Sequence, residues 1–147
     1  MKKVLVGMDS RTENFWPFIY AVNLAKRVQM KLYVLLVMSP QRSPSESEKG
    51  PQGGSSFRKR LETLISDGRS MGISIEYYIA NGSFKEELMG LIQDQEISLL
   101  VLGAPPAGTR GDLEKMDSLL EEIKFRTSCR IEVVHPRNPA QEKIRNG

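Results

Sequence analysis

Residues 97–112 (ISLLVLGAPPAGTRGD) constrain the fold of this chain more than any other stretch. They contain four consecutive apolar residues, LLVL at 99–102, followed by Gly103. A strand with one face in water alternates apolar and polar side chains, and this run does not alternate. It therefore predicts a strand covered on both faces, as in a parallel sheet with helices on each side. Leu100 and Val101 are expected to be buried on opposite faces of that sheet.

The rest of the chain alternates short apolar runs with segments of helical periodicity. Besides the run at 99–102, the predicted strands occupy residues 4–8, 32–38, 73–80 and 130–134. Because right-handed crossovers join consecutive parallel strands, the alternation predicts an α/β fold, a five-stranded parallel sheet with helices on both faces. We assign residues 1–136 to this single domain.

Two of the predicted helices carry further local signals. In the first, Phe15, Phe18, Val22 and Val28 recur at helical spacing and form one apolar face. The third opens with SFKE at 83–86, a capping box in which serine and glutamate satisfy free backbone N–H groups.

Two segments lack any apolar periodicity. Residues 39–56 (SPQRSPSESEKGPQGGSS) are rich in serine, proline and glycine and predict a long flexible loop. A linker between two domains is the alternative, but the helix predicted after it continues the same alternation. Residues 137–147 are polar and are expected to form a frayed tail.

Composition narrows the classes of function. The chain has 147 residues, a formal net charge of +3 and one cysteine, Cys129, which excludes an internal disulfide. No apolar run is long enough to span a bilayer, and no signal-peptide pattern opens the chain. These features predict a cytoplasmic protein. The mild positive charge comes without a nucleic-acid-binding motif, so nucleic acid is not an expected partner.

The loop after the strand at 99–102 is the candidate binding site. Open α/β sheets bind phosphorylated ligands at the carboxyl ends of their strands, where loop N–H groups and a helix N-terminus face the phosphate. Gly103, Gly108 and Gly111 suit such a loop because glycine allows close backbone approach. Pro105 and Pro106 interrupt it, and proline has no N–H to offer.

Several short motifs, in order and spacing, resemble the universal stress protein family from residue 1 to about residue 135. They include KVLV at 3–6 with MDS at 8–10, LAKR at 24–27, GSFKEEL at 82–88, SLLVLG at 98–103 and SCRIEVV at 128–134. The resemblance implies an adenine-nucleotide alpha-hydrolase-like fold, frequent homodimers and a role in stress responses rather than turnover. It also implies that some members bind ATP, through an aspartate after the first strand and glycines after the fourth.

The chain matches that ATP pattern only in part. Asp9 matches the aspartate and Gly103 the first glycine. The second glycine falls on Pro106, and the final glycine–hydroxyl pair falls on Met116-Asp117. The expected outcome is therefore no bound cofactor, with ATP as the alternative.

If ATP binds, we expect particular residues to contact it. They are Asp9, the backbone of Val37, Gly103, Thr109, Arg110 and Gly111. Residues 108–111 (GTRG) supply N–H groups, a hydroxyl and a guanidinium just before the fourth helix, whose N-cap would be Asp112. Asp9 has an alternative structural role, capping the first helix or stiffening the turn before it.

The last predicted strand is the expected dimer interface. Its residues are Arg130, Ile131, Glu132, Val133 and Val134. An unpaired apolar strand at a sheet edge invites association, and the resemblance implies pairing of this strand with its copy across a two-fold axis. In an antiparallel pair, Arg130 of one chain can lie opposite or diagonal to Glu132 of the other. A monomer whose edge is covered by the tail from Pro136 is the alternative.

Together these patterns predict a non-catalytic stress or regulatory module with an unidentified protein partner. No nucleophile with an orienting group stands near His135 in the sequence, so no catalytic residue is assigned. No spacing typical of metal ligands occurs, so no metal site is assigned. A member that senses or slowly hydrolyses ATP is the alternative, and a dedicated enzyme of the same superfold is the third possibility.

Overall fold

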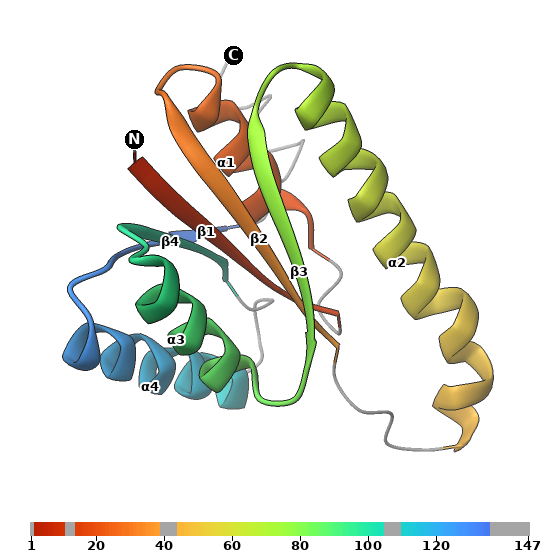
Figure 1. The fold of residues 1–147 in the computed structure, drawn as a ribbon. Helices are drawn as coiled ribbons and strands as arrows, with labels where there is room; N and C mark the ends of the chain where they lie inside the picture. Colours follow the sequence, from red (N-terminus) through yellow and green to blue (C-terminus); the bar gives the residue numbers. More distant parts are fainter. Residues whose placement is uncertain (1, 11–13, 39–43, 105–109, 136–147) are drawn as a thin grey trace, which may run out of the picture.

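The computed structural model describes residues 2–10, 14–38, 44–104 and 110–135. Its elements are, in order, β1 (Lys2–Asp9), α1 (Trp16–Ala25), β2 (Met30–Met38), α2 (Pro44–Ser70), β3 (Ser74–Asn81), α3 (Phe84–Gln95), β4 (Leu99–Gly103), α4 (Arg110–Arg126) and β5 (Arg130–Val134). The five strands form one parallel sheet in the order β3-β2-β1-β4-β5. The predicted α/β fold, with helices on both faces of the sheet, is confirmed (Figure 1).

The sheet separates two apolar cores. Phe18 of α1 and Leu61 of α2 belong to the core on one face, and Leu88 of α3 belongs with α4 to the core on the other. Within β4, Val101 lies in the first core and Leu100 in the second, and both are 0% exposed. Burial of adjacent residues on opposite faces confirms the prediction made from the non-alternating run.

α3 lies close to the sheet because Gly7 of β1 has no side chain. A Cβ at Gly7 would lie 2.6 Å from Leu88 Cδ2 and 3.0 Å from Leu102 Cδ2, so these side chains would have to shift to make room for it. The start of α3 follows the predicted capping motif, since the Ser83 hydroxyl accepts a hydrogen bond from the Glu86 N–H at 3.3 Å. The helix therefore begins at the carboxyl end of β3 and packs against β1 and β2.

The predicted loop over residues 39–56 is wrong for most of its length, because α2 begins at Pro44. Proline is well tolerated at the first helical position, where its missing N–H would have no partner in the helix. Residues 39–43 and the predicted tail at 137–147 lie outside the described residues.

The length of α2 explains why the apolar pattern did not reveal its first part. A helix of 27 residues is about 40 Å long, whereas the eight-residue strand β3 spans about 26 Å. A short turn at Gly72 joins the two, so the first part of α2 extends past the carboxyl end of the sheet (Figure 1). That part has no sheet to cover and needs no apolar stripe. No helix in the described ranges, α2 included, has the length and apolar character needed to cross a membrane.

α1 ends earlier than its apolar spacing predicted. Phe18 and Val22 are buried as expected, but the helix ends at Ala25 and Val28 is 44% exposed. The predicted place of Val28 on the apolar face is therefore wrong. The physical reason is that the chain leaves the helix to enter β2 at Met30, which ends the helical periodicity.

Candidate functional site

The carboxyl ends of β1, β2 and β4 form the candidate site. The strand order places β2 on one side of β1 and β4 on the other, so the chain reverses its direction of winding here. At such a switch point the connections diverge, and open α/β sheets bind ligands in the crevice between them. Asp9 ends β1 in register with Val37 of β2, and Gly103 ends β4. The fold thus brings together three of the residues that the sequence assigned to a nucleotide.

Val37 can offer a ligand little beyond its backbone. Its side chain is 1% exposed and belongs to the core under α3 and α4. Its carbonyl accepts a hydrogen bond from the Ser10 N–H at 3.0 Å, which holds the turn after β1 against β2. One acceptor site of that carbonyl is therefore already occupied. Asp9, its register partner, is half-buried.

Gly103 is covered by the start of α1. A Cβ at this position would lie 2.9 Å from Asn14 Nδ2 and 2.9 Å from Pro17 Cγ. Asn14 is held in place because its Oδ1 accepts a hydrogen bond from the Trp16 N–H at 3.0 Å, as in an Asx turn. Packing against α1 therefore requires a glycine at 103 with no ligand present. Sequence reasoning missed Asn14, although an asparagine shortly before a predicted helix is a recognised start signal.

α4 begins at Arg110, so Arg110 and Gly111 lie in its first turn rather than in a loop before it. The prediction of Asp112 as the N-cap is wrong for the same reason, since Asp112 is inside the helix. First-turn N–H groups have no acceptor within a helix and form a site where anions can bind. Thr109 and the prolines at 105–106 lie outside the described residues.

Met116 and Asp117 lie about two turns after the start of α4. Met116 packs against the core on this face, and Asp117 is exposed. Backbone N–H groups at this depth donate to carbonyls one turn earlier in the helix. Neither residue can therefore offer a free N–H to a phosphate, as the glycine–hydroxyl pair of the ATP pattern would require.

Hydrogen bonds and burial displace the pKa values of several side chains, among them Tyr77, Glu62 and Cys129. The Tyr77 hydroxyl of β3 donates to Glu62 Oε2 of α2 at 3.0 Å, and burial raises the pKa of Tyr77. Hydrogen bonds from Arg58 and Tyr77 lower the pKa of Glu62. Burial raises the pKa of Cys129 to about 11, so its side chain is a neutral thiol at physiological pH and a poor nucleophile. Within the described ranges, no cluster of three or more His, Cys, Asp or Glu residues could hold a metal ion.

Comparison with known proteins decides the family. The model of the Universal stress protein family matches residues 1–135 of this chain. The chain belongs to the universal stress protein family. No curated protein sequence matches it closely enough to count as a relative.

Solved universal stress proteins share the fold of this chain at low sequence identity. One from Lactobacillus plantarum is 20% identical, with 90% of this chain and 97% of that chain covered and a TM-score of 0.61. One from Arabidopsis thaliana, solved with AMP bound, is 17% identical, with 96% and 95% covered and a TM-score of 0.54. One solved in complex with cAMP is 18% identical, with 91% and 96% covered and a TM-score of 0.62. These likenesses establish the shared architecture.

In this universal stress protein, Gly103→Ala is expected to lower the free energy of unfolding by about 1–3 kcal/mol, because the added Cβ overlaps Asn14 and Pro17. Urea unfolding of the ligand-free protein measures the change. Gly90→Ala is the matched control, since Gly90 lies inside α3 with nothing within 4 Å of an added Cβ. There alanine is expected to stabilise by about 0.5–1 kcal/mol. Unchanged stability of Gly103→Ala would mean that packing does not require this glycine.

Proposed function

We propose that this chain is a non-catalytic regulatory module that acts as a homodimer and binds an as yet unidentified protein partner. The observation that carries the proposal is the carboxyl edge of the sheet. There α1 covers Gly103, and Met116 and Asp117 lie inside α4 instead of at its start. The residues of this chain therefore do not fit a tightly bound nucleoside triphosphate. We propose the cytoplasm as its compartment, because the chain has a single cysteine and only short apolar runs.

The position of β5 supports the homodimer. β5 is an edge strand, so its outer side carries unpaired backbone groups that a second strand can satisfy. Arg130 and Glu132 are exposed, while Ile131, Val133 and Val134 are half-buried. A two-fold antiparallel pairing of β5 with its copy would cover the apolar side chains and bring Arg130 near Glu132 of the second chain.

Nucleotide binding is the second candidate function. Asp9 lies beside Val37 at the switch point, and the first turn of α4 begins at the same edge of the sheet. The solved universal stress proteins with cAMP, AMP and dAMP show that the fold accepts adenine nucleotides in other members. In this chain the ligand would contact Asp9, the Val37 backbone, Gly103, Thr109, Arg110 and Gly111.

Titration calorimetry with Mg-ATP separates the two candidates. We expect any binding of Mg-ATP to be weaker than a low micromolar dissociation constant. We also expect mass spectra of freshly purified, denatured protein to contain no purine nucleotide. Asp9→Ala tests the site directly, and Asp94→Ala, an exposed carboxylate on α3 at the other end of the sheet, is the matched control. Low micromolar binding that only Asp9→Ala weakens would establish the second candidate instead.

A further inference from the structure

A cavity of about 260 Å³ opens at the amino end of the sheet, opposite the candidate nucleotide edge. It is lined by Lys2, Ser98, Leu99, Arg130, Ile131 and Glu132. These residues lie within the first three positions of β1, β4 and β5 or directly before them. The amino ends of three neighbouring strands thus form the cavity at one edge of the sheet.

The cavity lies on the face of the sheet that α1 and α2 cover, at a place where Arg130 and Glu132 of β5 remain exposed. The side chain of Lys2 lies on the same face of the sheet as that of Val4, two positions later, and Val4 belongs to the core under α1 and α2. Leu99 packs against the same core. Arg130 is in register with Leu99, and Glu132 follows two positions later, so both side chains lie on this face. α1 packs against β1, β2, β4 and β5, and α2 packs against β3. The amino half of β5 remains open beside α1, and Arg130 and Glu132 are exposed there.

Cations predominate on this side of the edge. Lys2 and Arg130 line the cavity, and Lys26 and Arg27 follow the end of α1 at the same edge, where the chain turns into β2. All four residues are exposed, and none of them is held in an ion pair by another described residue. Glu132 is the acidic member of the lining.

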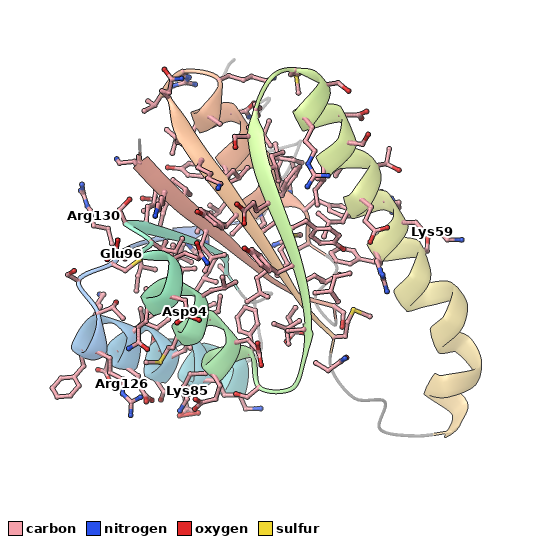
Figure 2. The ribbon with its side chains drawn as sticks, in the orientation of Figure 1. Lys59, Lys85, Asp94, Glu96, Arg126 and Arg130 are labelled. Carbon is pink, nitrogen blue, oxygen red and sulfur yellow. The ribbon has the colours of Figure 1, made fainter. Side chains whose placement is uncertain are left out.

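Besides Glu132 in the lining, two more acidic residues lie at this end of the molecule (Figure 2). Asp94 and Glu96 are at the end of α3, which covers the opposite side of the sheet. Figure 2 shows Arg130 at this amino end, with its side chain extending away from the body of the molecule. The cavity therefore has the cations Lys2 and Arg130 and the carboxylate of Glu132 around Leu99, whereas the Ile131 side chain packs against the core on the opposite face of the sheet.

We propose that this cavity docks an acidic, partly apolar peptide segment of a partner protein. Carboxylates of the segment would pair with Lys2 and Arg130, and an apolar side chain between them would cover Leu99. The inference rests on the proposed function, to which it adds the surface that meets the partner. In the proposed homodimer, the joined β5 strands would place two copies of the cavity on either side of the two-fold axis.

A peptide fits this lining better than a nucleic acid does. Glu132 stands inside the cavity and would repel a phosphate backbone, whereas a peptide can present an amide or hydroxyl to it. The lining also contains no aromatic side chain on which a base could stack.

Selection from a displayed library of random heptapeptides tests the proposal. Wild-type protein is expected to enrich peptides rich in Asp and Glu, and Lys2→Glu is expected to lose that enrichment. A synthetic copy of the enriched peptide is then titrated into labelled protein. Amide NMR shifts are expected at Lys2, Ser98, Leu99 and Ile131, with affinity at least about tenfold weaker in Lys2→Glu. Lys59→Glu, an exposed cation on α2 away from the cavity, is the matched control and should bind as wild type does (Figure 2).

Four outcomes would overturn the inference. They are no enrichment, enrichment of neutral or basic peptides, amide shifts at another surface, and tighter binding of a mixed single-stranded oligonucleotide at the same salt concentration. Light scattering on the same samples keeps the two proposals apart. A dimer that binds no acidic peptide would overturn only the docking site, whereas a monomer that binds it at this cavity would overturn only the homodimer.

Discussion

Replacing Leu100 by alanine is expected to lower the free energy of unfolding by about 2–5 kcal/mol, as measured by urea denaturation. Leu100 is 0% exposed in β4, between Leu5 of β1 and Ile131 of β5 in the sheet register. α3 and α4 cover this face of the sheet, so the surroundings cannot collapse easily into the space left by the missing side chain. A loss of this size is a large fraction of the stability of a single domain, about 5–15 kcal/mol.

Leu64→Ala is the matched control for this substitution. Leu64 is half-buried on α2 and packs against the other core, so the same truncation removes less buried surface. We expect it to cost less than half of what Leu100→Ala costs. Equal losses in the two variants would contradict the interpretation that the complete burial of Leu100 sets the cost of its truncation.

Val133→Lys is expected to convert the proposed homodimer into a monomer. Val133 is half-buried on the edge strand β5, and a lysine there would place a charge inside the contact between two β5 strands. We expect the dissociation constant of the dimer to rise at least about 100-fold, which corresponds to about 2.7 kcal/mol. Light scattering at a fixed protein concentration measures the change in mass.

The opposite edge of the sheet supplies the control for the dimer experiment. Ile79 lies on the other edge strand, β3, and is 39% exposed, so Ile79→Lys makes the same chemical change away from the proposed interface. It should leave the dimer intact. A second pair tests the register: Arg130→Glu should weaken the dimer, and adding Glu132→Arg should restore it. A monomeric wild type, or a dimer that Val133→Lys leaves unchanged, would rule out pairing through β5.

Local sequence patterns predicted the elements that bury a face against the sheet. The run at 99–102 predicted a strand buried on both sides, and each core contains part of it: Val101 lies in one core, and Leu100 and Leu102 lie in the other. The capping motif at 83–86 predicted the start of α3, because its hydrogen bond joins residues only three positions apart. The alternation of apolar runs with helical periodicity also predicted the parallel sheet. Each of these patterns is local, because it depends on which side chains of its own segment are buried.

The candidate site could be predicted only in part. The residues at the strand ends, Asp9, Val37 and Gly103, came together as expected because parallel strands share one carboxyl edge. The start of α4 lies at the same edge, but Arg110 and Gly111 belong to the helix and not to a loop before it. A glycine-containing loop and a first helical turn look alike in sequence, because neither carries an apolar stripe that would mark the boundary.

The sequence by itself determined the α/β fold, the buried strand β4 and the capped start of α3, all of which depend on neighbouring residues and their periodicity. Only the tertiary structure decided that α2 begins at Pro44, because the first part of this helix extends beyond the carboxyl end of the sheet (Figure 1). Only the tertiary structure set Asn14 and Pro17 over Gly103 and gathered Lys2 with Arg130 around one cavity. These groups are far apart along the chain, so their contact follows from how the strands are ordered in the sheet, which no local pattern records.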